Sequence, residues 1–435
     1  MKGNATMKIK KYSAYKDSGI EWIGDIPEHW EVTRSKWLWK EVNVRSKDGL
    51  EQLLSVSQYD GVRLANVESR SESLGDYKIV KENDLVMNIM LVWLGGLGVS
   101  QYNGLVSPSY AVYRPLLKIY ELYFHFLYRT TFYLKEFAKK STGVVPSRWR
   151  LYSDAFGDIY TILPPLSEQK KIASFLDKKT AEIDKAIELK QKENELLKEH
   201  RQITINQAVT RGLNPNVPLK DSGIEWIGDI PEHWEVRKLK YLAKVNPTRN
   251  DRLIIKYINE DVVNLPMEKI SEKWEVDQSL FASTRSLMSG LTYFEKNDIL
   301  LAKITPCFEN GKGAYLDQLK TEMGFGTTEL HVIRSKDNTT QCFLSYVLRS
   351  YMFKELATIN MIGTAGQKRV SSFFLSNYIF TYPPLSEQKE ISAYLEEVDK
   401  ETNRLIELNH RAIEKLKEYK QVLIDQAVRG EICLV

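Results

Sequence analysis

Apolar residues recur every three or four positions through residues 386–428, which is the spacing of a helix with one apolar stripe. The segment contains neither proline nor glycine, Ser386 suits a helix N-cap, and Gly430 suits a C-terminal stop. The pattern therefore predicts one long helix with a coiled-coil seam, in which steps of four and three alternate. The predicted seam positions are Ile391, Leu395, Val398, Thr402, Leu405, Asn409, Ala412, Leu416, Tyr419 and Leu423.

Residues 167–210 predict a second long helix, which begins at Ser167 and ends before Gly212. Its stripe is weaker, because two lysines and a glutamate fall on the seam. We expect the two helices to pair antiparallel, since a whole module separates them in the sequence. The alternative is two independent amphipathic helices on separate cores. The residues predicted to pair are Ile172, Leu176, Ile183, Leu197, Ile391, Leu395, Val398, Leu405, Asn409, Leu416 and Leu423.

The chain contains a tandem duplication, in which three motifs recur in the same order. They are KDSGIEWIGDIPEHWEV at 16–32 and 220–236, PPLSEQK at 164–170 and 383–389, and QAVTRG at 207–212, which returns as QAVRG at 426–430. The second copy is longer than the first between the opening motif and PPLSEQK. From PPLSEQK to the start of the last motif, the two copies have the same length. The spacing from Glu168 to Gln207 equals that from Glu387 to Gln426, so the helices keep one length. Such a long period indicates two copies of a whole domain.

Residues 33–163 and 237–382 are each predicted to form a globular module of mixed structure. Short β-rich runs alternate with turn signals, and one helical stretch falls near 120–140 and another near 341–357. We therefore predict an α+β protein: two globular α/β-mixed modules separated by two long antiparallel coiled-coil helices. The modules carry net charges of +4 and +5. A phosphate-binding surface requires such an excess, although ordinary surface variation explains it equally well.

One loop recurs in both modules shortly before PPLSEQ. It reads STGVVPSRWR at 141–150 and GTAGQKRV at 363–370. Small and hydroxylated residues let backbone approach a ligand closely, and arginine can bind guanine or phosphate. A lone loop of this kind is usually only a turn, but its recurrence in two diverged modules favours contact with DNA. The candidate DNA-binding residues are Thr142, Gly143, Arg148, Trp149, Thr364, Gly366, Gln367, Lys368 and Arg369, and weaker candidates, which solvated surface would also explain, are Ser57, Tyr59, Arg63, Lys303 and Lys312.

Composition and missing motifs narrow the class of protein. The chain is 43% apolar and 27% charged, as in ordinary globular proteins, and its three cysteines are too few and scattered for a disulfide framework or a zinc site. The longest apolar stretch, 85–99, is broken by glycines, and no apolar segment opens the chain, so we expect a cytoplasmic protein. The motifs HExxH, GxxxxGK[ST], GxSxG and Asn/Asp-Pro-Pro-Tyr/Phe are absent, so we expect neither a catalytic site nor a metal site. We expect His29 and His233 to have packing roles.

These motifs resemble the specificity (S) subunit of type I restriction–modification enzymes over nearly the whole chain. The IPEHWEV openings, the PPLSEQ helix starts and the QAV(T)RG endings look like the conserved regions of that family. The resemblance implies that each module is a target-recognition domain reading one half of a split, asymmetric double-stranded DNA target, with a pseudo-twofold axis relating the halves. The implied domains are a first recognition domain at 1–163, a spacer helix at 164–212, a linker at 213–219, a second recognition domain at 220–382, a second spacer helix at 383–430 and a tail at 431–435.

The resemblance also implies the partners. The paired helices would set the spacing of the two half-sites and dock two modification (methyltransferase) subunits. Whether two restriction (translocase and nuclease) subunits join is left open. S-adenosylmethionine, ATP and Mg would belong to the partner subunits, so this chain would be a non-catalytic part of a host-defence complex.

Two other classes of protein fit parts of the sequence. A coiled-coil scaffold with two protein-binding modules would have no DNA affinity in any assembly. A self-contained methyltransferase or nuclease would need a catalytic motif, and none of those sought is present. The sequence identifies neither the recognised bases nor the methylated base.

Overall fold

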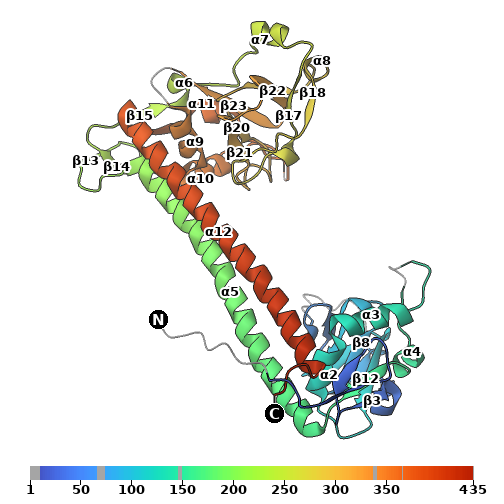
Figure 1. The fold of residues 1–435 in the computed structure, drawn as a ribbon. Helices are drawn as coiled ribbons and strands as arrows, with labels where there is room; N and C mark the ends of the chain where they lie inside the picture. Colours follow the sequence, from blue (N-terminus) through green and yellow to red (C-terminus); the bar gives the residue numbers. More distant parts are fainter. Residues whose placement is uncertain (1–9, 66–73, 146–148, 337–339, 365, 435) are drawn as a thin grey trace. The chain divides into compact units, whose positions relative to one another are not determined.

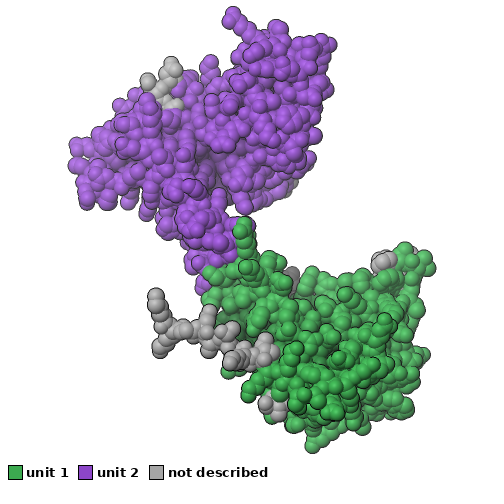
Figure 2. All heavy atoms as spheres, in the orientation of Figure 1, with its two compact units in different colours: residues 1–190, 410–435 green, residues 191–409 purple. Residues whose placement is uncertain are grey.

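The computed structural model describes residues 10–65, 74–145, 149–336, 340–364 and 366–434. They belong to two compact units (Figure 2), one made of residues 1–190 and 410–435 and the other of residues 191–409. Each unit therefore contains one module and a part of both long helices. In the part of the chain that is described, no helix is long and apolar enough to cross a membrane.

The two long helices, α5 (Leu166–Arg211) and α12 (Leu385–Val428), are drawn in green and red in Figure 1. Both begin one residue before the serine predicted as N-cap. In α5 the carbonyl of Pro165 already accepts hydrogen bonds from the amides of Glu168 and Gln169, so the helical pattern starts before Ser167.

The helices pair antiparallel, as predicted. In the second unit, Asn409 Nδ2 donates to Asn194 Oδ1 at 2.9 Å, and Arg201 Nη1 donates to Asn403 Oδ1 at 3.2 Å. From Asn194 to Arg201 the position on α5 shifts toward its C-terminus, while the paired residue on α12 shifts toward its N-terminus, which is the relation of antiparallel helices. In the first unit, the Lys420 ammonium of α12 lies 2.6 Å from both carboxylate oxygens of Asp184 of α5.

The buried seam of α12 differs from the predicted one by one residue in each heptad. Thr402, Asn409 and Leu423 lie in the seam, but Ile406 and Ile413 are buried where Leu405 and Ala412 were expected. Tyr419 is 55% exposed, and the half-buried Lys420 takes its place. The apolar pattern fitted both registers, and the observed one buries Ile413 in place of the smaller Ala412. Of the predicted pairing residues, Ile172, Leu176, Ile183, Ile391, Leu395, Asn409 and Leu423 are buried, and Leu197, Val398, Leu405 and Leu416 are partly exposed.

The first module is built around one antiparallel sheet of order β4-β11-β8-β9. Its helical stretch consists of two helices, because the hydroxyl of Thr130 bonds to the carbonyl of Leu127 at the break. The elements are β1 (Tyr15–Asp17), β2 (Asp25–Pro27), β3 (Glu31–Arg34), α1 (Ser35–Leu38), β4 (Trp39–Val42), β5 (Leu54–Ser57), β6 (Gly61–Leu64), β7 (Lys78–Val80), β8 (Leu85–Asn88), the 3-10 helix η1 (Val92–Leu94), β9 (Leu97–Val99), β10 (Gly104–Val106), β11 (Tyr110–Pro115), α2 (Glu121–Tyr128), α3 (Thr131–Lys140), α4 (Ser153–Gly157) and β12 (Tyr160–Leu163).

The second module repeats this frame with a sheet of order β16-β23-β20-β21. Its elements are β13 (Leu219–Asp221), β14 (Asp229–Pro231), β15 (Glu235–Lys238), α6 (Leu239–Leu242), β16 (Ala243–Val245), α7 (Asp251–Lys256), β17 (Asp261–Leu265), η3 (Met267–Lys269), β18 (Phe281–Ser283), α8 (Thr284–Leu287), β19 (Thr292–Glu295), β20 (Ile299–Ala302), β21 (Gly313–Tyr315), β22 (Met323–Gly326), β23 (Leu330–Ser335), α9 (Gln341–Arg349), α10 (Tyr351–Ile359), α11 (Ser372–Asn377) and β24 (Ile379–Tyr382).

The extra residues of the second module lie in the part of the chain that forms a second sheet. The first module has a counterpart of this sheet in two pieces, in which β5 pairs with β6, β7 pairs with β10, and Leu53 forms a parallel bridge with Leu105. Most of the added length falls between β16 and β20, whose counterparts in the first module are β4 and β8. There the chain contributes three strands to a sheet of order β18-β17-β22-β19, in which β17 and β22 are parallel. This sheet has its own apolar cluster, which includes Val262, Tyr293 and Phe325. The modules thus share the arrangement of both sheets, and the second sheet is continuous in the second module but divided into two strand pairs in the first.

A carboxylate, buried in the first unit and partly exposed in the second, fastens each module to the start of a long helix. In the first unit, Glu168 of α5 accepts hydrogen bonds from Trp30 Nε1 at 3.0 Å and from the Tyr12 hydroxyl at 2.8 Å. Its other oxygen lies 2.6 Å from His29 Nε2. Burial alone would raise the pKa of the Glu168 carboxyl, but these hydrogen bonds outweigh it and lower that pKa.

The second unit repeats this clamp with the duplicated residues. Glu387 of α12 accepts from Trp234 Nε1 at 2.9 Å and lies 2.6 Å from His233 Nε2. The histidines therefore serve packing and anchoring within each unit. Because the motif sequences are identical, the histidine and tryptophan make the same contacts with the glutamate in both copies, whereas Tyr12 precedes the repeated motif and corresponds to Asn216.

The same tryptophans also contact the end of the other long helix. A Cβ added to Gly430 would lie 2.5 Å from Pro27 Cγ and 3.0 Å from the ring of Trp30, and one added to Gly212 would lie 3.1 Å from the ring of Trp234. Both glycines have positive φ, +73° and +75°. Each opening motif therefore joins the start of one long helix to the end of the other.

Replacement of Gly430 by alanine should destabilise the first unit beyond the cost of its backbone conformation. The positive φ alone costs about 1 kcal/mol, and the collision with Pro27 and Trp30 adds to it. Gly228→Ala is the matched control, because Gly228 has φ +68° and no atom within 4 Å of its added Cβ. Thermal unfolding should show a clearly larger loss for Gly430→Ala; equal losses would mean that the contact with the clamp is unimportant.

Candidate nucleic-acid interface

A buried aspartate–arginine pair joins the central strands in each module. Asp84, which precedes β8, accepts from Arg114 Nε of β11 at 3.0 Å. Asp298, which precedes β20, accepts from Arg334 of β23 through two nitrogens, at 2.7 and 2.6 Å. Each aspartate follows an asparagine with positive φ, so the same turn and the same ion pair occur in two otherwise diverged sequences. These pairs hold the frame that carries the variable loops.

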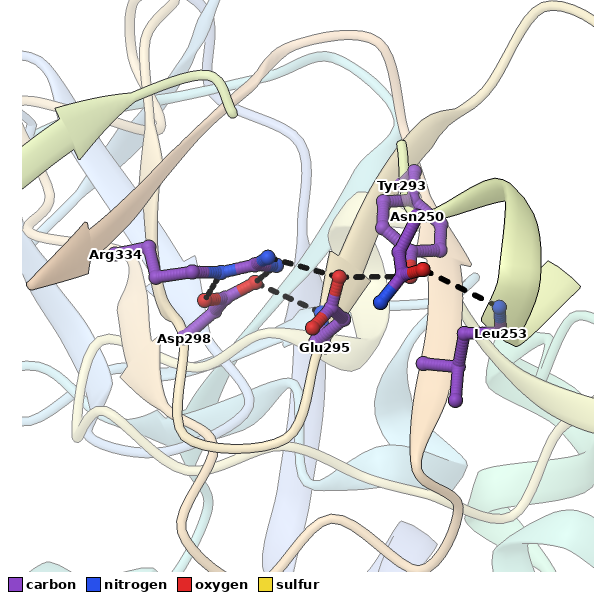
Figure 3. A network of polar contacts seen from close by, with 6 residues as sticks. All are labelled: Asn250, Leu253, Tyr293, Glu295, Asp298 and Arg334. Carbon is purple, nitrogen blue, oxygen red and sulfur yellow. Dashed lines mark hydrogen bonds and ion pairs between the residues drawn. The ribbon is translucent and has the colours of Figure 1, made fainter. Parts of the chain in front are cut away.

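In the second module, this pair extends into a network that reaches β19 of the β18-β17-β22-β19 sheet (Figure 3). Arg334 Nη1 bonds to Glu295 at 2.8 Å, and the Tyr293 hydroxyl donates to the same carboxylate at 2.9 Å. Burial raises the pKa of Asp298, against the opposing effect of Arg334, and the carboxylates in turn raise the pKa of Arg334. The charged groups therefore hold the β18-β17-β22-β19 sheet against the β16-β23-β20-β21 sheet.

The recurring loop is closed in the same way in both modules. Thr142 and Arg150 exchange two backbone hydrogen bonds of 3.0 Å, and Ile362 and Arg369 exchange two of 3.0 and 2.8 Å. Both loops follow the second helix of a pair, α3 or α10. The sequence similarity of these loops thus corresponds to a shared geometry.

The loop of the first module exposes small and apolar residues. Thr142 and Gly143 are exposed, and Val144 is 96% exposed. Trp149 is half-buried, with its ring 5.3 Å from the ring of Trp93 in an edge-to-face contact. The predicted DNA-binding residue Arg148 lies outside the described residues.

The loop of the second module exposes polar residues at its tip. Lys368 is exposed, and its backbone bonds to Thr305, so the tip is fixed while the ammonium group faces solvent. Gly366 has φ +81°, which favours glycine at the turn. The exposed candidates here are Thr364, Gly366, Gln367 and Lys368.

Arg369 is engaged inside the protein. Its guanidinium donates to Glu329 at 2.8 and 3.0 Å, and this hydrogen bonding lowers the pKa of the Glu329 carboxyl. Arg369 therefore braces the loop, and less of its hydrogen-bonding capacity is left for DNA than the sequence suggested.

The weaker candidates divide between exposed and structural positions. Tyr59 is 79% exposed at the turn between β5 and β6, and Ser57 accepts the Tyr59 amide at 3.0 Å, which shapes that turn. Arg63 is exposed, with Nη1 3.8 Å from Asp60. Lys303 is half-buried beside the recurring loop. Lys312 donates its ammonium to the carbonyl of Met267, which makes it a support within the module.

Two supporting residues were missed by sequence reasoning. Arg129 donates to the carbonyls of Gly95, Leu97, Gln58 and Tyr59, so it fixes the exposed β5–β6 turn. His331 is buried, with Nε2 2.8 Å from the Val370 carbonyl and Nδ1 3.2 Å from Asn246. Burial lowers the pKa of His331, which favours the neutral ring that this geometry requires. The acceptors of these side chains include backbone carbonyls, which every residue has, so the sequence pattern does not indicate them.

Within the described residues, no group of three or more His, Cys, Asp or Glu side chains is arranged to hold a metal ion. The polar clusters above are ion pairs and carbonyl clamps that position loops. These contacts hold loops on a frame that is the same in both modules, while the residues that the loops expose differ between the modules.

Comparison with known proteins identifies the family. The family model described as the type I restriction modification DNA specificity domain matches residues 65–199 and 231–417. The chain therefore belongs to this family. It is 36% identical to the specificity subunit of the Escherichia coli type I restriction enzyme EcoAI over 165 residues, which are 38% of this chain and 27% of that protein. The match thus spans about a quarter of that relative.

Two further similarities cover nearly the whole chain. The MjaVIII specificity subunit of Methanocaldococcus jannaschii is 26% identical over 427 residues, which are 94% of either chain. The crystal structure of the HsdS subunit from Thermoanaerobacter tengcongensis has a TM-score of 0.54 at 14% identity, and covers 94% of this chain and 98% of that one. At that identity the structural similarity concerns the fold alone.

Proposed function

We propose that this chain is the DNA-specificity subunit of a type I restriction–modification complex, in which each module reads one half of a split, asymmetric sequence. The observation that carries the proposal is the recurring loop, which has the same closure in both modules but presents different side chains. A shared frame with different exposed residues suits recognition of two different half-sites. The rival class, a scaffold with two protein-binding modules, has no specific observation in its favour.

The catalytic chemistry in this proposal belongs to partner subunits. S-adenosylmethionine, ATP and Mg would bind there, and the present chain would supply recognition in the cytoplasm without a reaction of its own.

We further propose that two modification subunits dock on the long helices. Leu189 of α5 and Leu408 of α12 are 58% and 47% exposed, and they occupy equivalent positions when the two PPLSEQ motifs are aligned. Ile203 and Val422 form a second such pair, at 49% and 45% exposure. Exposed apolar residues that recur with the repeat support two equivalent docking faces for two copies of one partner.

Loss of the exposed lysine in the recurring loop should weaken DNA binding. Lys368→Ala in the assembled methyltransferase should cost about 1–3 kcal/mol and relax specificity at one position of one half-site if Nζ contacts a base edge. A phosphate contact would instead weaken all sequences alike and reduce the salt slope by about one. Lys220→Ala in β13 is the control. Unchanged affinity at low salt would exclude a role for this loop in DNA binding.

Charge placed on the docking faces should reduce the number of bound partners. The purified complex should contain two modification subunits per copy of this chain by native mass measurement. Leu189→Glu with Val422→Glu should release one of them, because both residues belong to the first unit, and Ile203→Glu with Leu408→Glu should release the other. Gln191→Glu is the control at an exposed polar position. Two bound subunits in both double variants would place the docking faces elsewhere.

We also propose that the helix pair sets the spacing of the half-sites. Duplication of residues 184–190 in α5 and 413–419 in α12 adds one heptad to each helix and keeps Asn194 opposite Asn409. Each helix gains about 10 Å, which corresponds to about three base pairs. Methylation mapping should show both half-sites with a gap longer by about three base pairs, or no activity if the new helical phase fails. An unchanged gap would show that the helices do not set it.

A further inference from the structure

One polar pair lies inside the otherwise mostly apolar seam of the helix pair. Asn194 and Asn409 are 4% and 5% exposed, and the Nδ2 of Asn409 donates to the Oδ1 of Asn194 at 2.9 Å. Ile406 and Ile413 are buried on the same stripe of α12. A buried asparagine pair weakens a coiled coil relative to apolar residues, so its value lies in what it specifies.

The duplication creates a choice of partner for each helix. Because α5 and α12 derive from one repeat, α5 of one copy of the chain could pair with α5 of a second copy, and α12 with α12. The anchors at the helix ends do not prevent this, since the clamp glutamate, tryptophan and glycine are the same residues in both repeats.

The charged pair near the first unit disfavours pairing of α12 with α12, because the residue of α12 equivalent to Asp184 is Asn403, but it does not disfavour pairing of α5 with α5. Asp184 pairs with Lys420 of α12, and the residue of α5 equivalent to Lys420 is Arg201, another cation. Pairing of α5 with a second α5 would therefore keep an ion pair at that position.

The asparagine pair also distinguishes the two helices. When the two PPLSEQ motifs are aligned, Asn194 corresponds to Ile413 and Asn409 corresponds to Lys190. Pairing of α5 with α5 in the equivalent register would place Asn194 opposite Lys190, which donates but cannot accept a hydrogen bond. Pairing of α12 with α12 would place Asn409 opposite Ile413, which does neither. Asparagine meets asparagine only when α5 pairs with α12.

We propose that Asn194 and Asn409 select the partner of each helix, so that α5 pairs with α12 and not with its own kind in a second copy. Pairing of α12 with α12 would leave the buried Asn409 amide opposite Ile413 without a hydrogen-bond partner, whereas in the α5 pair Lys190 could donate to the Asn194 oxygen. The cost of the α12 pair therefore disfavours the like-with-like dimer. This role does not depend on the proposed DNA function, since it concerns how the chain folds and associates.

The test uses two full-length copies with different tags, unfolded, mixed and refolded at high concentration. The variant Asn194→Ile with Asn409→Lys gives each position the residue of its repeat equivalent, so every pairing then opposes isoleucine to lysine. The fraction of mixed-tag dimers should rise about tenfold above wild type, because like-with-like pairing loses its penalty. Circular dichroism checks that the variant folds. A folded variant whose dimer fraction equals that of wild type would overturn the proposal.

A second variant reaches the same end without changing the pair. Lys190→Asn with Ile413→Asn opposes asparagine to asparagine in every pairing, so mixed-tag dimers should again increase. Thr402→Val is the control, because Thr402 is a buried seam residue outside the pair and its change leaves the asparagine match intact. Exchange between unlike helices contributes equally to wild type and variants, so the increase reports like-with-like pairing. No increase in this variant would also overturn the proposal.

Discussion

The attachment of each module to its helices depends on one carboxylate that accepts an indole N–H. The glutamate at the start of a long helix holds the tryptophan of the opening motif, and that tryptophan packs on the glycine that ends the other long helix. One side chain thus fixes the angle of a module on two helices at once. A flexible linkage would leave the exposed loops free to reorient, and a fixed one delivers them in a defined direction to whatever they bind.

Conservation of this anchor allows the rest of each module to vary. The aspartate–arginine pair and the four-stranded sheet recur in both copies, although their sequences have few residues in common. In the second module the chain between β16 and β20 is longer and Arg334 also pairs with Glu295, while the strand order of the four-stranded sheet is unchanged. New recognition surfaces can therefore accumulate on a base that keeps the same attachment, which suits a family whose members must read different targets.

The sequence predicted the long helices and the duplication because both depend on the spacing of residues and motifs along the chain, which can be read directly from the sequence. It misplaced three of the ten seam positions, such as Leu405 for Ile406, because both residues are apolar and only packing in three dimensions distinguishes them. It identified the recurring loop but could not see that Arg369 is held by Glu329, which lies far from it along the chain. Arg129 gave no signal, since its partners are carbonyl groups that every residue possesses.

The order in which the chain is made bears on these contacts. The second unit is one continuous stretch, whereas the first is completed by residues 410–435. The hydroxyl of Tyr15 bonds to the carbonyl of Gly430, and that of Tyr123 to the carbonyl of Val428. During synthesis from the N-terminus, the first module must therefore wait with part of its apolar base uncovered until the last turns of α12 leave the ribosome. Loss of the final residues would accordingly damage the module that was made first.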